Sequence, residues 1–165
     1  MEYWDLYTKA GQKSAIVIPK GQKIPHGLFH IIVETLIKHE DGTYLVMKRD
    51  YNKAEFPGLY EGSAGGSLIS GETKEEGAIR EVKEETGLII TEVFPTYYFV
   101  NDETRAINQG YIAYIKGKKD IVYLKGDTID HKWLSLPELK EFIKSKDYNP
   151  KHSQRLATYL ETLNN

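Results

Sequence analysis

The sequence predicts an α/β fold built on a mixed β-sheet, and three observations support this class. First, residues 28–38 and 44–48 are rich in β-branched and aromatic side chains and are separated by an Asp-Gly turn, which is typical of a β-hairpin. Second, residues 92–100 and 107–116 predict two more strands that are apolar on both faces, which favours burial under helices or at a ligand surface. Third, capping motifs predict three helices.

The first predicted helix spans residues 74–86. Thr73 and Glu76 have the spacing of a capping box, in which each side chain accepts a hydrogen bond from the backbone N–H of the other residue. Gly87 stands where a helix ends in the left-handed conformation. These two signals define both ends of the helix.

Two more helices are expected within residues 136–163. Ser135 and Glu138 repeat the capping-box spacing, so the second helix should run to about residue 145. The third should begin at Asn149 and Pro150, and its apolar residues lie on one stripe. That stripe consists of Leu156, Tyr159, Leu160 and Leu163. Both helices are therefore expected to cover a core.

Length and composition narrow the function classes. The chain has 165 residues, which predicts one domain over residues 1–165. Its 22 basic and 24 acidic residues give a net charge of -2, without the basic excess of proteins that bind nucleic-acid polymers. The absence of cysteine excludes disulfides, thiol nucleophiles and cysteine-based metal sites. A small molecule is the expected partner, and homodimerisation is left open.

No membrane segment is expected. The longest apolar stretches, such as residues 15–18 and 31–33, are strand-sized and far shorter than a bilayer span. Residues 1–5 have neither a basic nor an apolar character typical of a secretory signal. We therefore expect a cytoplasmic protein.

Glu81, Glu84 and Glu85 form an acidic stripe on the first helix. At positions i, i+3 and i+4 the three carboxylates fall within about 100° of arc on one face. An ordinary solvated charged face would explain such a stripe. However, like charges four residues apart destabilise a helix by about 0.2–0.5 kcal/mol, and the helix dipole at this end favours cations. Oxygen ligands at this spacing suit a hard divalent cation, Mg²⁺ or Mn²⁺.

A glycine-rich loop over residues 65–71 leads into this helix, and the two features together form a known motif. Residues 66–88 read Gly, five residues, Glu72, seven residues, and then Arg-Glu-Val-Lys-Glu-Glu-Thr-Gly-Leu. This stretch resembles the full Nudix box, G-x5-E-x7-R-E-U-x-E-E-x-G-U with U aliphatic, of the Nudix hydrolase family. Residues 56–61 resemble the strand that leads into the box, and residues 132–136 resemble the strand-to-helix exit of that family.

The resemblance implies a fold and a chemistry. It implies an α/β/α sandwich around a mixed sheet, with an N-terminal hairpin in residues 1–27, the Nudix box at 66–88 and the C-terminal helices at 136–163. Most members cleave a nucleoside diphosphate that is linked to another moiety. A polyanionic diphosphate repels hydroxide, so its hydrolysis needs cations that neutralise phosphate oxygens and acidify water. The expected activity is metal-dependent hydrolysis of a diphosphate linkage in a nucleoside diphosphate derivative or related small diphosphate.

Box positions assign roles by resemblance. Glu84 and Glu85 correspond to the main metal ligands, and Glu81 to a ligand or a base that orients water. Glu72 is expected to pair with Arg80 and fix the loop to the helix. The Gly65 carbonyl is a further candidate ligand, Asp127 is the first candidate for an additional base and Asp130 is the second. Candidate substrate contacts complete the set: Lys48, Arg49, Tyr97 and Tyr111. The ordinary alternatives for these last residues are surface charge and core packing.

Residues 24–30 resemble the Nudix branch that is related to isopentenyl-diphosphate isomerases. Those isomerases use a catalytic cysteine, and the corresponding residues 62–65 contain none. His26 and His30 resemble metal-binding histidines of that branch, or are strand-end residues. Two alternatives to the hydrolase therefore remain: an isomerase-like enzyme on diphosphate substrates, and a non-catalytic nucleotide-binding domain. The complete set of box carboxylates argues against the second.

Overall fold

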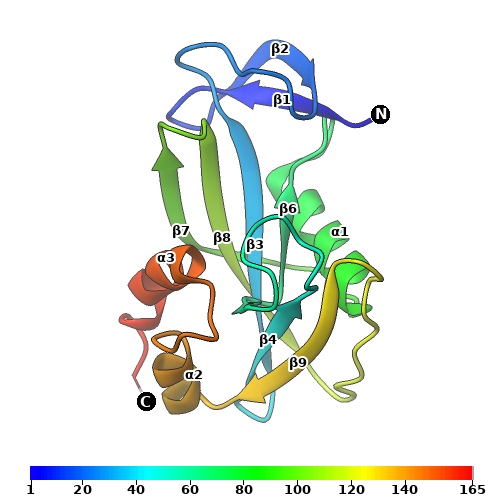
Figure 1. Cartoon of the computed structure of the whole chain (residues 1–165), viewed down its shortest axis with the longest axis vertical. Coiled ribbons are helices and arrows are strands. Elements are labelled where there is room, and N and C mark those ends of the chain that lie inside the picture. The colour runs from blue at the N-terminus through cyan, green and yellow to red at the C-terminus, as the bar shows by residue number, and fades with distance from the viewer. Residues whose placement is uncertain (165) are drawn as a thin grey trace.

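The computed structural model describes residues 1–164, which form nine strands and three helices (Figure 1). The strands are β1 (Tyr3–Tyr7), β2 (Lys13–Pro19), β3 (His30–His39), β4 (Tyr44–Arg49), β5 (Tyr60–Glu61), β6 (Ala64–Ser67), β7 (Phe94–Asn101), β8 (Ala106–Ile115) and β9 (Thr128–Leu134). The helices are α1 (Lys74–Thr86), α2 (Leu136–Phe142) and α3 (Pro150–Leu160).

The main sheet is mixed and is organised around β3. Along one edge, β3 runs parallel to β8 from the His30–Ala106 pair to the His39–Ile115 pair, and β7 is antiparallel to β8. The other edge of β3 has two partners: β6 pairs with its first half and β4 with its second half. β5 and β9 pair with β4. The sheet therefore forks beside β3, between β4 and β6.

Ser63 joins the two sides of this fork. Its Oγ accepts a hydrogen bond from the backbone N–H of Ile37 at 2.8 Å and donates one to the carbonyl of Leu45 at 2.7 Å. The side chain is fully buried. A hydroxyl is well suited to this position because it can donate and accept at once.

The sheet lies between helices on both faces, which confirms the predicted α/β/α arrangement. Successive side chains of a strand point to opposite faces. Val33 and Ile37 of β3 pack in the clusters that include Ala78 and Val82 of α1. Leu36 packs in the opposite cluster, with residues of α2 and α3. Figure 1 shows α2 and α3 together near the C-terminus, away from α1.

The predicted helix 74–86 matches the observed bounds of α1. The capping box is present in both directions, at 3.1 and 3.2 Å, and Gly87 has a φ of 78°. The C-terminal helices are shorter than predicted: α2 ends at Phe142 and α3 at Leu160. Residues beyond each end form turns, because apolar periodicity marks a buried face and does not by itself mark where the helix stops.

β1 and β2 form a separate two-stranded sheet within residues 1–27. Asp5 of β1 accepts hydrogen bonds from Ser70 Oγ and from the backbone N–H of Gly71, both at 2.8 Å. Nζ of Lys13 lies 3.2 Å from Oδ2 of Asp5. Burial raises the pKa of Asp5, but these partners together lower it by a larger amount, so the net pKa is below its usual value. The hairpin is thus tied to the loop that precedes α1. Among the described residues, no helix is long and apolar enough to span a membrane.

We predict that Ser63→Ala destabilises the protein by about 1–3 kcal/mol, because it leaves a buried N–H and a buried carbonyl at the fork without their partner. Urea unfolding followed by circular dichroism measures this. Ser14→Ala, at a half-buried residue of the mostly exposed β2, serves as the control and should change the free energy of unfolding by less than about 0.5 kcal/mol. Equal stability of the Ser63 variant and wild type would contradict the role of the hydroxyl.

Candidate active site

Arg80 is the cationic centre of the acidic helix. Its guanidinium binds both carboxylate oxygens of Glu72, with the Nη2–Oε2 bond at 3.0 Å, so the expected pair is present. The same group donates to Glu81 at 2.8 Å and to Glu84 at 3.3 Å. The hydrogen bonds to Glu72 are the main cause that raises the pKa of Arg80. One arginine thereby fixes the glycine-rich loop to α1 and neutralises part of the acidic stripe.

Glu85 differs from the other two acids of the stripe. Burial raises the pKa of its carboxyl well above the usual value, and the neighbouring carboxylates of Glu81 and Glu61 raise it further. Burial also raises the pKa of Glu81, although Arg80 partly offsets this. Among the described residues, Glu85 has no cationic partner. A partly buried carboxylate in this position favours either a proton or a cation at its side.

Gly65 and Gly66 of β6 allow these carboxylates to reach the strand. The backbone N–H of Gly65 lies 3.4 Å from Glu85 Oε2. A Cβ at Gly66 would stand 2.6 Å from Cδ of Glu81, closer than side chains can pack. Only glycine leaves room for the Glu81 carboxyl at this point.

The structure separates the two candidates for an additional base. Asp127 lies near Glu85, since its charge contributes to the raised pKa of that residue, and it is ion-paired with Lys53. Asp130 accepts hydrogen bonds from Tyr60 at 2.9 Å and from the backbone of His131 at 2.8 Å. Asp127 is therefore the better placed of the two.

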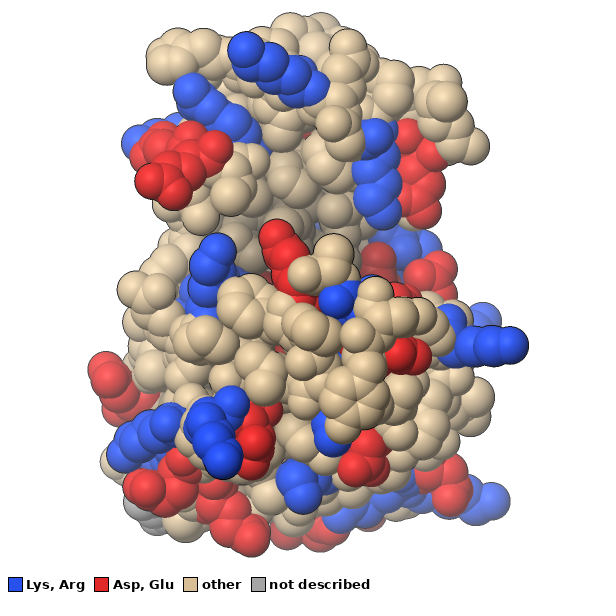
Figure 2. Space-filling view, viewed as in Figure 1, with Lys and Arg blue, Asp and Glu red and all other residues tan. Residues whose placement is uncertain are grey.

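A cleft of about 380 Å³ runs along the α2–α3 face of β3. His30, Ile32 and Glu34 form its floor, because alternate residues of the strand share one face. Gly65 and Gly66 line the same cleft, so it reaches the strand that contacts the acidic stripe. Figure 2 shows this side of the molecule hollowed below the N-terminal hairpin.

The cleft contains a buried ion pair that the sequence did not reveal. Arg155 of α3 binds Glu34 through two hydrogen bonds, at 2.8 and 2.6 Å, and Tyr97 donates to the same carboxylate at 2.8 Å. Burial raises the pKa of Glu34, but His152 and Arg155 lower it by more than burial raises it. The net pKa is below the usual value, so the carboxylate stays ionised. A charged residue inside the apolar run of β3 was the one sequence signal for this site.

Glu61 is a second residue that sequence reasoning missed. It lines the cleft, accepts a hydrogen bond from Arg49 at 2.8 Å and another from Asn149 at 3.1 Å. Arg49, an expected substrate contact, also lines the cleft. It therefore lies where a phosphate could reach it, with Glu61 holding its guanidinium.

Three other expected substrate contacts lie outside the cleft lining. Tyr111 is 2% exposed in the core cluster under α1, on the opposite face of the sheet, which corrects its assignment as a substrate contact. Lys48 lies over the rings of Tyr51 and Tyr60, at 5.1 and 5.8 Å from their centroids. Tyr97 reaches the cleft indirectly, through its hydrogen bond to Glu34.

The rings of His26 and His30 each contact another side chain. His30 stacks on Trp4 with ring centroids 3.9 Å apart. The ring of His26 contacts the guanidinium of Arg105 at 2.9 Å from Nδ1. A cation already occupies the near side of His26, and this arrangement disfavours metal binding there.

Comparison with known proteins places this geometry in a family. The sequence matches the model of the NUDIX domain over residues 28–158. The chain belongs to the Nudix family. It is 26% identical over 163 residues to an uncharacterized Nudix hydrolase of Listeria monocytogenes, a match that covers 91% of this chain and 89% of that protein. These matches support the enzyme class that the sequence predicted, a Nudix hydrolase.

A shorter match leads to the isomerase branch. Over 68 residues the Nudix chain is 37% identical to the isopentenyl-diphosphate Delta-isomerase of Salmonella heidelberg. That segment covers 41% of this chain and 38% of the isomerase. The branch resemblance inferred from the sequence is thus present, over less than half of each protein.

Solved structures confirm the Nudix fold. A protein from Deinococcus radiodurans superposes with a TM-score of 0.74 at 20% identity, covering 96% of this chain and 99% of that one. The NUDIX domain of Shewanella oneidensis NrtR, in complex with ADP-ribose, gives a TM-score of 0.65 at 17% identity, covering 89% and 94%. At these identities the likeness concerns the fold alone.

The donor set fits a divalent cation. Glu81, Glu84 and Glu85 offer carboxylate oxygens, and the Gly65 carbonyl lies on the adjoining strand. Within residues 1–164, no three acidic or histidine side chains already converge into a metal site. Arg80 holds Glu81 and Glu84, whereas the partly buried Glu85 has no positive partner among these residues. A hard cation of charge +2 would supply the positive charge that Glu85 lacks.

We predict that Glu34→Gln lowers the free energy of unfolding by about 3–5 kcal/mol at pH 7, because it leaves Arg155 buried without a counter-charge. The pKa of Glu34 is lowered in the folded state, so its contribution exists above the unfolded pKa and is lost as the pH falls through the folded pKa. The stability gap between wild type and variant should therefore shrink on acidification below pH 4.5.

Urea unfolding at several pH values tests this. The control is Glu141→Gln, which breaks an exposed ion pair with Lys144 and should change stability by less than about 1 kcal/mol at every pH. Similar losses in the two variants, or a gap that widens in acid, would contradict the prediction.

Proposed function

We propose that this Nudix hydrolase cleaves a diphosphate linkage in a nucleoside diphosphate derivative or a related small diphosphate, and that it depends on Mg²⁺ or Mn²⁺. One observation carries the proposal: the carboxyl of Glu85 lies beside Glu81 and Glu61 in a partly buried position, has no cationic partner among the described residues, and adjoins a strand that lines the cleft. A cation bound there neutralises phosphate oxygens and acidifies a water molecule.

The residues of the chain divide the remaining work. Glu81, Glu84 and Glu85, with the Gly65 carbonyl, would hold the cation. Arg80 and Glu72 act as positioning residues, because their ion pair fixes the loop that carries the glycines against α1.

Asp127 is the proposed additional base. Its carboxylate is held by Lys53 close enough to Glu85 to raise that residue's pKa. Arg49, held by Glu61 at 2.8 Å, supplies positive charge to a phosphate in the cleft. The oxygen ligands of the metal, the proposed base Asp127 and the positively charged Arg49 thus come from different segments of the chain. Such an arrangement places charges around the reacting phosphate before it binds.

We predict that Glu85→Gln lowers turnover of a diphosphate substrate at least about a hundredfold, because the amide keeps the size of the side chain and removes one unit of ligand charge. Phosphate products measured with Mg²⁺ and with Mn²⁺ give the readout. Glu75→Gln, an exposed change at the other end of α1, is the control and should stay within about threefold of wild type. A Glu85→Gln enzyme with activity close to that of the control would disprove the assignment.

Metal binding should also appear as a change in stability. For a protein with one metal site, a metal concentration of a hundred times the Kd increases the free energy of unfolding by about 2.7 kcal/mol. In Glu84→Gln/Glu85→Gln protein, the rise in Tm on replacing EDTA with Mn²⁺ should vanish, and the Tm in EDTA should stay level or increase. A rise of the same size in the double variant would place the cation elsewhere.

Isomerisation of a prenyl diphosphate is the second candidate, because of the segment shared with the isopentenyl-diphosphate Delta-isomerase. The chain has no cysteine, and Ser63, in the corresponding stretch, has its hydroxyl bound between two backbone groups. The residues of the cleft therefore favour hydrolysis.

We predict that the reaction in ¹⁸O-labelled water places label in a phosphate product of a nucleoside diphosphate derivative and leaves the carbon skeleton unchanged. Mass spectrometry of the products measures this, with isopentenyl diphosphate as the parallel substrate. Migration of the double bond in unlabelled diphosphate would instead identify an isomerase.

A further inference from the structure

Two adjacent amide side chains in the middle of β8 differ in their hydrogen bonds. Gln109 donates to the carbonyls of Tyr97 and Gly110, at 3.0 and 3.1 Å, and its oxygen lies 3.5 Å from Nζ of Lys74 on α1. Asn108 points to the opposite face of the strand, is only 8% exposed and makes no side-chain hydrogen bond with residues 1–164. Asparagine is depleted in strands, and buried polar groups normally have partners. The amide of Asn108 therefore needs a partner from outside these residues.

The neighbours of Asn108 on its own face of the sheet cannot supply this partner. Ile32 of β3 and Phe99 of β7 are its cross-strand neighbours. Ala106 and Gly110 stand two residues before and after it on β8. These four residues have no polar side-chain atoms. An amide in such surroundings costs free energy unless it is hydrogen-bonded, so it does not serve to stabilise the sheet.

The cleft gives access to the Asn108 side chain, which forms part of its lining. Within residues 1–164, the side-chain nitrogen and oxygen atoms that are fully buried and lack a partner belong to Trp4, His30 and Trp133. The amide atoms of Asn108 lack a partner but are not among them, so they remain in contact with the cleft. A molecule in the cleft can therefore form hydrogen bonds with this amide.

The lining of the cleft changes from charged to neutral along β3. The charged lining residues come from β3, from β4 and β5 with the loop between them, and from α3: Glu34, Arg49, Glu55, Glu61, Lys151 and Arg155. The lining residues from the β7–β8 hairpin are all uncharged: Asn101, Thr104, Ala106 and Asn108. Glu34 pairs with Gly65, and Ile32 pairs with Asn108, so the strand register sets the two groups in order. We call them the charged end and the neutral end.

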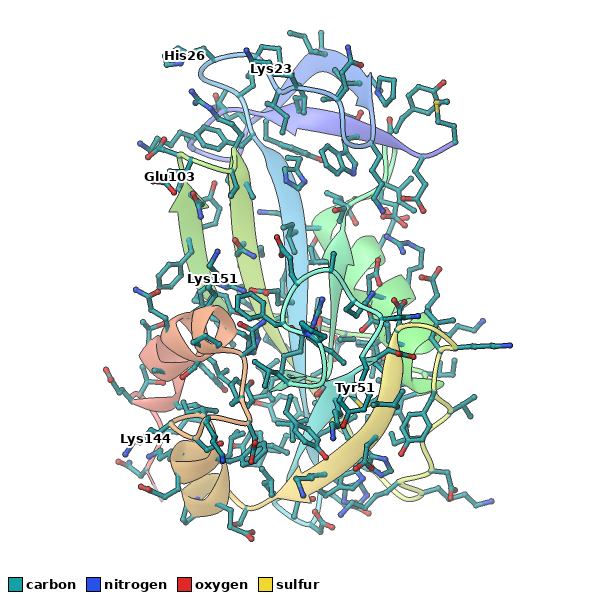
Figure 3. All side chains as sticks on the ribbon, viewed as in Figure 1. Lys23, His26, Tyr51, Glu103, Lys144 and Lys151 are labelled. Carbon is teal, nitrogen blue, oxygen red and sulfur yellow. The ribbon has the colours of Figure 1, made fainter. Side chains whose placement is uncertain are left out.

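A second cavity of about 570 Å³ adjoins the neutral end, and we name it the hairpin cavity. His30 and Thr104 line both the cleft and this cavity. The loop between β2 and β3 and the turn between β7 and β8 form its walls, and Figure 3 labels Lys23 and His26 from that loop and Glu103 from that turn. A ligand that reaches the neutral end therefore has space on the side away from the charged end.

The neutral end suits a hydroxyl-bearing group better than a nucleobase. An amide both donates and accepts, and a hydroxyl is a single group that does the same in return. The hydroxyl of Thr104 and the amide nitrogen of Asn101 make no hydrogen bond with residues 1–164 either, so further groups of this kind are at hand. A base gains much of its affinity by stacking on a ring. The one ring at this end, His30, is already stacked on Trp4, with ring centroids 3.9 Å apart.

We infer that Asn108 is a specificity-determining residue, which hydrogen-bonds a hydroxyl group of a neutral sugar ring or polyol attached to the diphosphate. The inference rests on the proposed function, because it places the diphosphate at the charged end, beside Gly65 and Arg49. Two strand spacings of about 4.8 Å and a rise of two residues put the Cα atoms of Asn108 and Gly65 about 12 Å apart. A phosphate with an attached sugar ring, together with the Asn108 side chain, can bridge this distance. We name the position the hydroxyl subsite.

Glucose 1-phosphate and cyclohexyl phosphate provide a matched test, because both carry a phosphate on a six-membered ring and only the first has ring hydroxyls. Neither contains a diphosphate linkage, so NMR titrations can be run with Mg²⁺ present and without turnover. Asn108→Leu keeps the branched shape of the side chain and removes its donor and acceptor. The Kd of glucose 1-phosphate should rise about fivefold in this variant, the factor for one hydrogen bond of about 1 kcal/mol.

Cyclohexyl phosphate should bind Asn108→Leu as tightly as wild type or more tightly. An unchanged Kd of glucose 1-phosphate in the variant would overturn the inference. The same would follow from an equal loss for both ligands, or from no binding of glucose 1-phosphate to wild type at millimolar concentration.

Gln109→Met is the control, because it removes the neighbouring amide that is already hydrogen-bonded on the other face of the sheet. It should lower the Tm by about 2–4 °C and leave the Kd of glucose 1-phosphate unchanged. Asn108→Leu should leave the Tm level or raise it, since no hydrogen bond within the protein is lost. A fall in Tm as large as that of Gln109→Met would show that the Asn108 amide is structural and would reject the subsite.

These binding experiments are separate from the test of hydrolysis. Binding as expected without cleavage of any diphosphate would reject the proposed function and leave the hydroxyl subsite. Cleavage of UDP-glucose with the same KM in wild type and in Asn108→Leu would reject the subsite and leave the hydrolase. With both ideas correct, Asn108→Leu raises KM for UDP-glucose about fivefold and leaves kcat unchanged.

Discussion

The fork in the main sheet is the constraint on which the rest of the structure depends. Because β3 pairs with β6 along one half of its edge and with β4 along the other, β6 is free to carry glycines against α1. The buried hydroxyl of Ser63 keeps the fork closed at its base. α1 packs on one face of β3, and the cleft lies on the other. The fork brings them to one strand.

The carboxylates of this site differ in whether an arginine is paired with them. Arg80 compensates Glu72, Glu81 and Glu84, and Arg155 compensates Glu34. These paired groups keep their positions without a ligand. Glu85 has no such partner within residues 1–164, and burial and its neighbouring carboxylates raise its pKa well above the usual value. Among the acids of the stripe, Glu85 is thus the one without an ion pair within residues 1–164.

The cleft and the hairpin cavity share β3 as their common floor. Its side chains on one face change from charged at Glu34 to apolar at Ile32 and then to a neutral ring at His30. Asp5, which binds the loop before α1, holds the hairpin in the position that completes the second cavity.

Local sequence patterns determined α1, its caps, the Glu72–Arg80 pair and the family, because each depends on residues within one short segment. The same patterns located the main strands to within about two residues. Tyr111 shows where this reasoning fails, since a tyrosine in an apolar strand suits a ligand surface or a core, and only the pairing of β8 with β3 put it under α1. Glu34 and Arg155 are 121 positions apart, so only the packing of α3 on the sheet brings them together. The sequence by itself indicated the candidate reacting groups, and the tertiary structure decided the cleft that they adjoin, because contacts between distant segments depend on strand order and leave no local periodicity to detect.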